Sequence, residues 1–139
     1  MPQSRDQGLG DGVRRAEGVA PYDLYILGGG LMSVDRPYSV VITTCGDREL
    51  AKRLSYMLVE LRLAACVQIF PVESVYVWKD SVCNDDEFVL LIKTRAELFD
   101  ELVSAIRENH SYEVPEIIQI PITDGLPEYL AWISENCKE

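Results

Sequence analysis

The stretch "AACVQIFPVESVYVWKDSVCNDDEFVLLIKT", residues 64–94, decides the fold, because it places strand patterns one after another with no helix between them. Residues 64–79 are predicted to be extended, with a break or bulge at Pro71. Residues 81–86 are predicted to form a turn. The last segment, residues 87–94, is apolar on both faces and therefore predicts a strand that is buried on both.

Helical patterns flank this stretch on both sides. Residues 47–63 carry leucines at helical spacing behind Asp47, a residue that can cap a helix. Thr94 and Glu97 have the spacing of a capping box, which predicts a second helix that ends near Asn109. Two extended segments are thus enclosed between two helices.

The remaining segments complete the order. Residues 38–44 and 116–123 are predicted strands, and a short third helix is predicted to start at Pro127. The sequence therefore predicts a split βαβ arrangement, a ferredoxin-like α/β (α+β) sandwich with helices on one face of an antiparallel sheet. Because the other face lacks helices, we expect copies of the chain to cover it, and we predict a homo-oligomer.

Composition limits the function classes. The 139 residues include 13 Lys plus Arg and 23 Asp plus Glu, a net charge of −10 that would repel nucleic acid, so we expect no nucleic-acid partner. Residues 1–36 are rich in Gly and charged side chains, and we expect an N-terminal extension that is disordered or that precedes a true start at Met32. Residues 37–139 are predicted to form one domain.

Cysteine spacing and hydropathy set the expected location. Cys45, Cys66, Cys83 and Cys137 show no zinc-type spacing. No apolar run is long enough to span a bilayer, and the first residues lack the pattern of a secretory signal. We therefore expect a cytoplasmic protein with reduced thiols and no membrane partner.

Four blocks of this sequence resemble the CutA divalent-cation tolerance family: "RLAACVQIFPVESVYVWK" (62–79), "DDEFVLLIKT" (85–94), "HSYEVPEIIQIPI" (110–122) and "YLAWI" (129–133). The resemblance covers residues 38–136 and implies a ferredoxin-like protomer in a homotrimer similar to PII signalling proteins. It also implies a role in tolerance of divalent metals, copper in particular. It supplies no catalytic mechanism, so we expect that the chain is not an enzyme.

The chain departs from the family at several of these positions. Residues 110–116 stand where the family has its His-Pro-Tyr-Glu-Val-Pro-Glu block, with Ser111 in place of the usual proline. The thiol that some members carry at the position of Thr43 is found at Cys45, and Asn109 stands where some members have a second histidine. A copper site transferred from those members would be incomplete here.

Three interpretations of these residues remain open. A copper site would use His110, Cys45 and Glu113, because imidazole and thiolate are ligands that copper prefers. A PII-like small-molecule site would draw on aromatic and charged side chains of the sheet and of the 110–116 segment: Trp78, Lys93, Glu87, Tyr112 and Glu116. In the third interpretation the aromatic residues fill an intersubunit core. Catalysis has the least support, because the one histidine is far in sequence from Cys45.

Overall fold

The structure is a computed structural model that describes residues 14–15, 23–27, 30–34 and 36–139. The chain divides into two compact units, Met1–Pro37 and Tyr38–Glu139, and each is described by itself. In the first unit, three strands pair antiparallel in the order β1-β2-β3: β1 (Arg14–Arg15), β2 (Asp23–Leu27) and β3 (Gly30–Val34). Apart from these three strands and Arg36, the residues of the segment 1–36, which was predicted to be disordered, lie outside the described residues. The start at Met32 stays a prediction.

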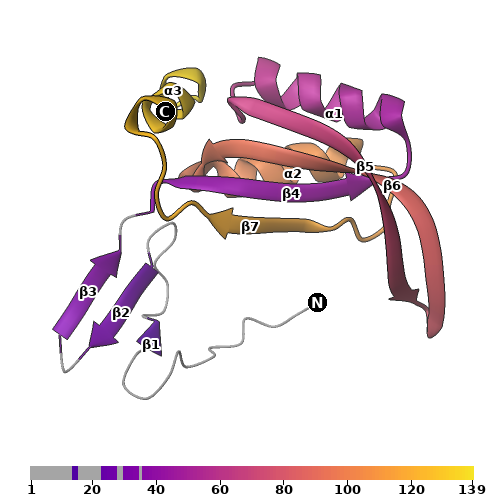
Figure 1. The fold of residues 1–139 in the computed structure, drawn as a ribbon, viewed down its shortest axis with the longest axis horizontal. Coiled ribbons are helices and arrows are strands. Elements are labelled where there is room, and N and C mark those ends of the chain that lie inside the picture. The colour runs from indigo at the N-terminus through magenta and orange to yellow at the C-terminus, as the bar shows by residue number, and fades with distance from the viewer. Residues whose placement is uncertain (1–13, 16–22, 28–29, 35) are drawn as a thin grey trace. The chain divides into compact units, whose positions relative to one another are not determined.

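The second unit follows the predicted order. Its elements are β4 (Tyr38–Cys45), α1 (Arg48–Glu60), β5 (Cys66–Trp78), β6 (Ser81–Arg95), a 3₁₀ helix (Ala96–Leu98), α2 (Phe99–Asn109), β7 (Ile117–Pro121) and α3 (Pro127–Asn136). The strands form one antiparallel sheet in the order β5-β6-β4-β7 (Figure 1). The predicted α+β class with a ferredoxin-like strand order is confirmed.

The long hairpin of β5 and β6 corrects two local predictions. β5 is one 13-residue strand that runs through Pro71, which is tolerated because β5 is an edge strand and needs hydrogen bonds on one side only. The turn predicted at residues 81–86 is wrong, since those residues belong to β6. The chain turns instead at Lys79 and Asp80, whose φ angles of 48° and 65° suit a two-residue hairpin turn.

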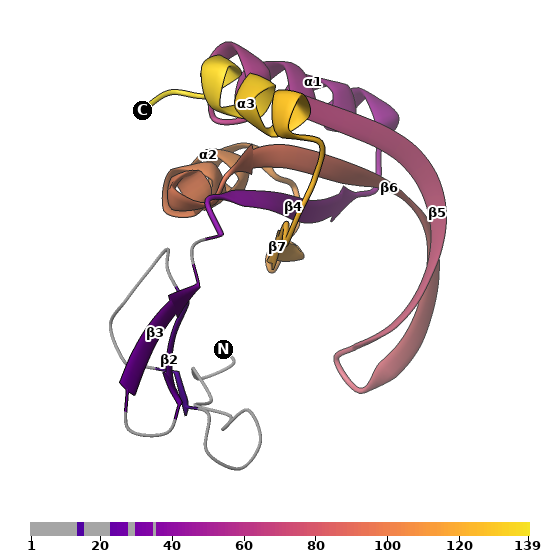
Figure 2. The ribbon, with the colours of Figure 1, turned by 60° about the vertical axis from the view of Figure 1, so that its left-hand side comes forward.

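The hairpin extends beyond the rest of the sheet. β4 pairs with β6 only as far as Cys45 and Phe88, whereas β5 and β6 remain paired to Trp78 and Ser81. We call this extension, residues 72–87, the hairpin arm; it curves away from β4 and β7 (Figure 2). Among the described residues of the second unit, the two strands of the arm therefore pair only with each other.

The two faces of the sheet are covered differently. Val41, Leu90 and Ile92 are fully buried and belong to one core cluster with the buried residues of α1 and α2. On the opposite face, Phe70, Ile118 and Ile120 remain 40 to 45% exposed. The segment 87–94 was predicted to be buried on both faces. On the helix side Leu90, Ile92 and Thr94 are fully buried and Phe88 is half-buried. On the helix-free side Glu87 and Val89 are buried, whereas Leu91 and Lys93 are half-buried.

Candidate functional site

The only histidine fixes the loop between α2 and β7. His110 Nδ1 lies 3.0 Å from the backbone nitrogen of Tyr112, which donates to it, so the proton of the neutral ring belongs on Nε2. Nε2 lies 2.7 Å from the carbonyl oxygen of Thr44 and donates to it. Both ring nitrogens are therefore engaged within the protein. A metal could take Nε2 only if the bond to Thr44 were broken.

Tyr112 connects this loop to the helix-free face of the sheet. Its hydroxyl donates to Glu87 Oε2 at 2.8 Å, and burial followed by this hydrogen bond raises the pKa of the phenol above its ordinary value. A Cβ added at Gly46 would lie 3.0 Å from the Tyr112 hydroxyl oxygen. The absence of a side chain at Gly46 therefore leaves space for the ring to reach Glu87.

Cys45 lies at the end of β4 but belongs to the hydrophobic core. It is fully buried, and its Sγ donates to the carbonyl oxygen of Asp47 at 3.4 Å. Burial is the main cause that raises the pKa of the thiol, with the nearby charges of Asp47 and Glu87 acting in the same direction. The thiolate, which is the form that binds metal or attacks a substrate, is thus disfavoured here.

A hollow of about 810 Å³ opens between the hairpin arm and the loop that follows His110. Its walls carry three aromatic side chains, Tyr76, Trp78 and Tyr112. Four carboxylates also line it, those of Glu73, Glu87, Glu113 and Glu116. No lysine or arginine is among the residues that line this hollow, which we call the aromatic–acidic pocket. Its size is in the range of small-molecule sites.

The pocket brings together most of the residues proposed from the sequence as ligand-binding. Trp78, Glu87, Tyr112 and Glu116 line it, and so does Glu113 from the proposed metal set. Lys93 does not line the pocket. Its ammonium group donates instead to the side-chain oxygen of Gln68, which lies elsewhere on the same face of the sheet.

Several residues that line this pocket were not proposed from the sequence, among them one carboxylate and one threonine. Glu73 and Thr44 both line it, and Thr44 is 8% exposed. Alternation along β4 places Thr44 on the helix-free face, opposite to its neighbour Thr43 in the core, so the strand periodicity contained the signal. For Glu73 there was no comparable signal, because its position depends on the curvature of the arm.

The proposed metal ligands are not assembled into a site in one chain. His110 is bonded at both nitrogens, Cys45 is in the core, and Glu113 lines the pocket. Across the described ranges of the chain, no three His, Cys, Asp or Glu side chains are grouped closely enough to hold a metal ion.

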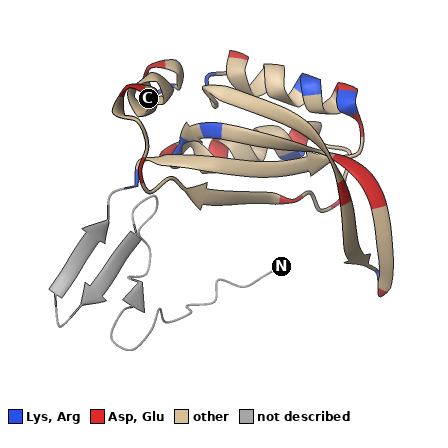
Figure 3. Ribbon diagram, in the orientation of Figure 1, with Lys and Arg blue, Asp and Glu red and all other residues tan. Residues whose placement is uncertain are grey.

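Negative charge gathers on the hairpin arm beside the pocket. Asp85, Asp86 and Glu87 are consecutive on β6, where Figure 3 shows a continuous acidic stretch. Tyr76 donates a hydrogen bond to Asp85, which is the main cause that raises the pKa of Tyr76 to about 12. The arm thus combines the phenol of Tyr76 with several carboxylates, a surface that attracts cations.

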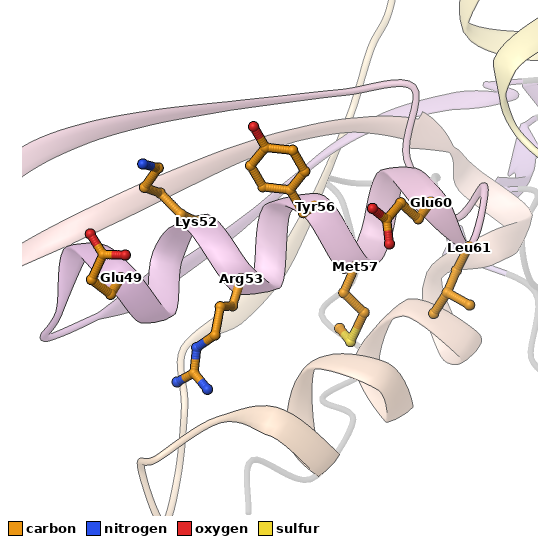
Figure 4. Close-up of a pocket in the computed structure, with 7 residues that line it drawn as sticks. All are labelled: Glu49, Lys52, Arg53, Tyr56, Met57, Glu60 and Leu61. Atoms are coloured by element: carbon orange, nitrogen blue, oxygen red, sulfur yellow. The ribbon is translucent and has the colours of Figure 1, made fainter.

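A second hollow lies along the outer side of α1, and its lining residues differ from those of the aromatic–acidic pocket (Figure 4). All its lining residues come from this helix and the residue after it, and they include both Glu49 and the cations Lys52 and Arg53. Arg53 and Met57 extend to the side where α2 lies, and Tyr56 extends to the other side. These side chains diverge, so they do not form a convergent binding site.

Fold and site together define a small α+β protein with a half-exposed apolar sheet face and an aromatic–acidic pocket, and no described helix is long and apolar enough to cross a membrane. Residues 39–136 match the family described as CutA1 divalent ion tolerance protein. The chain belongs to this family.

Relatives and solved structures agree with the assignment. The chain is 44% identical over 103 residues to "Protein CutA, chloroplastic" of Arabidopsis thaliana, covering 73% of this chain and 57% of that protein. It is 44% identical over 98 residues to the divalent-cation tolerance protein CutA of Thermus thermophilus, covering 70% of this chain and 95% of that protein. The crystal structure of CutA1 from Oryza sativa superposes with a TM-score of 0.72 at 43% identity, covering 74% of this chain and 95% of that chain.

These relatives confirm one expectation and correct another. The family and its members are named for tolerance of divalent ions and not for a catalysed reaction, as expected for a chain that is not an enzyme. The expectation of a cytoplasmic location is wrong: the Arabidopsis and Oryza relatives are named chloroplastic, and the Archaeoglobus fulgidus structure is described as a periplasmic protein. The chain spans only 57% and 59% of those two plant relatives.

Proposed function

We propose that the chain acts in divalent-ion tolerance as a homotrimer that binds copper. The half-exposed apolar residues of the helix-free sheet face carry the assembly part of this proposal. Phe70, Ile118 and Ile120 leave on this face the kind of apolar surface that protein partners cover. β5, 13 residues long, lies at the edge of the sheet formed by the described residues, and such an edge is a template for pairing with another strand. The homotrimer implied by the resemblance to the CutA family supports three copies.

The metal part of the proposal follows from the separation of the candidate ligands. Since the described residues of one chain do not gather three of them, we propose that ligands from two copies meet around the ion. Glu113, which lines the pocket, is the ligand that this chain would contribute with least rearrangement. His110 would join only by giving up its bond to Thr44, and Cys45 only by leaving the core.

The test is a titration of the metal-free, full-length protein with Cu(I), Cu(II) and Zn(II), with the mass measured by light scattering in the same samples. We expect a trimer mass and saturable copper binding that is weakened in Glu113→Gln and in His110→Ala. Cys45→Ala tests the thiol in the same way. Glu60→Gln, an exposed substitution on α1, is the control. Weak, unsaturable binding would remove copper from the proposal, and a monomer mass would remove the trimer.

A second candidate function, the binding of a small molecule as in PII-like signalling proteins, is supported by the aromatic walls of the pocket. Tyr76, Trp78 and Tyr112 are aromatic residues that line one hollow together with polar groups, which is the composition of ligand sites. A phosphate-bearing ligand would meet four carboxylates and no cation there, so the ligand chemistry must differ from that of an anionic nucleotide.

A further inference from the structure

We propose that the aromatic–acidic pocket binds an organic ammonium ion, an alkylamine or a quaternary ammonium compound. This ligand class rests on the small-molecule function of the pocket and not on the metal function. Aromatic ring faces and carboxylates are the two groups that attract such ions, and both line this hollow. Its volume of about 810 Å³ is ample for a small amine.

Glu87, which lines the pocket, favours a cationic ligand. Its residue is 7% exposed. Its side chain accepts a hydrogen bond from the Tyr112 hydroxyl, and in the part of the chain that the structure describes no lysine or arginine pairs with it. A buried carboxylate without a positive partner is costly, and a bound cation would remove that cost.

Thr44 supplies a second oxygen on the same face of the sheet as Glu87. Its residue is 8% exposed and lines the pocket. Register places Thr44 opposite Val89, two positions along β6 from Glu87 on the same face of the sheet. An ammonium N–H could therefore donate to either oxygen, from a position against the aromatic wall.

Trp78 already attracts an ammonium group in this chain. The Nζ atom of Lys79 lies 5.7 Å from the centroid of the Trp78 ring, within the range of cation–π attraction. The ring quadrupole thus acts on a cation at the exposed end of the arm. A ligand ammonium deeper in the pocket would have Tyr76 and Tyr112 as well, and exclusion of water there strengthens the attraction.

The spacing of the carboxylates favours an organic ion over a compact one. Four glutamates line the pocket, yet the described residues include no group of three that could ligate a single metal ion. A metal ion needs several oxygens at about 2 to 2.5 Å. An ammonium ion attached to a carbon skeleton needs only one or two acceptors and uses the aromatic walls for the rest of its surface.

The experiment compares choline with 3,3-dimethylbutan-1-ol, its neutral analogue of the same shape, by calorimetric titration of the full-length protein. Butylamine and 1,4-diaminobutane serve as further ammonium probes. We expect saturable binding of at least one ammonium probe, and choline binding about tenfold tighter than that of the alcohol. Trp78→Leu and Glu87→Gln should each weaken binding of the ammonium probe about tenfold, whereas Glu60→Gln should leave it unchanged.

Two outcomes separate this proposal from the others. If choline and the alcohol bind equally, the pocket binds small molecules but has no preference for cations, and the ammonium proposal fails. If no ammonium probe binds the folded protein, both the ammonium proposal and the small-molecule function fail. Titration of Trp78→Leu with copper should match the unsubstituted protein, since a metal does not need the ring; thermal unfolding and light scattering confirm that each variant is folded.

Discussion

The two faces of one sheet follow the same strand alternation and end in different environments. Leu90 and Ile92, on the helix-covered face, are fully buried by α1 and α2, whereas Ile118 and Ile120, on the other face, are 45 and 44% exposed. Within one chain the first face is complete and the second is not. Strand periodicity therefore sorts residues between faces, but it does not reveal what covers each face.

The largest expected effect tests this difference directly. Leu90→Ala should lower the free energy of unfolding by about 2 to 5 kcal/mol, because it leaves a cavity in a core that cannot close around it. The measurement is urea unfolding at several protein concentrations. Ile118→Ala, the matched substitution on the helix-free face, should cost less within one chain, and its effect should vary with protein concentration because the loss falls on association. Equal, concentration-independent costs would contradict the comparison.

His110→Ala should have the next largest effect. It removes two hydrogen bonds and leaves the Thr44 carbonyl and the Tyr112 N–H without partners, so we expect a loss of about 1 to 3 kcal/mol. Urea unfolding of protein freed of metal by a chelator isolates this structural role. Ser111→Ala, at the exposed neighbouring position, is the control. No loss of stability in metal-free His110→Ala would show that the two bonds contribute nothing.

Tyr112→Phe tests the hydrogen bond between Tyr112 and Glu87 on the helix-free face through the pH dependence of stability. The pKa of Tyr112 is raised in the folded chain, so the stability linked to its proton is fully present below the unfolded value of roughly 10 and is lost as the pH rises above it toward the folded pKa. Thermal unfolding should therefore show a shallower loss of stability above roughly pH 10 in Tyr112→Phe. Identical alkaline slopes in the two proteins would contradict the buried hydrogen bond to Glu87.

The smallest effect is a gain on the helix-covered face. The hydroxyl of Thr43 is buried without a hydrogen-bond partner, so Thr43→Val, which keeps the shape, should raise stability by about 1 kcal/mol. Thr44→Val, whose hydroxyl faces the pocket, should change stability less. Chemical denaturation measures both, and a loss in Thr43→Val would mean that its hydroxyl has a partner.

The sequence predicted the elements whose signals are local. Asp47 caps α1 as expected, with its Oδ1 accepting from the Glu49 backbone nitrogen at 2.9 Å. The capping box at Thr94 was wrong, because the Thr94 hydroxyl donates to the distant Leu63 carbonyl and β6 continues to Arg95. A side chain that could cap a helix had a long-range partner, which no local pattern reveals.

The site was predictable in its residue types and not in its contacts. The block 110–116 was identified from its residues and its family resemblance, but the bond from His110 to Thr44 joins positions 66 residues apart. Only the folded sheet brings them together. The turn at Lys79 and Asp80 was missed because it lacks the glycine that usually marks positive φ, although both residues adopt it.

The measurement that tests the central claim most directly is the solution mass of the full-length chain and of Ile118→Asp, by light scattering. The account predicts three times the chain mass for the unsubstituted protein and dissociation of the variant, because a charge on the helix-free face cannot be buried against another copy. Tyr56→Asp, at a 66% exposed position on α1, should leave the mass unchanged. A monomeric unsubstituted protein, or an Ile118→Asp variant that keeps the full mass, would contradict the claim that other copies complete this face.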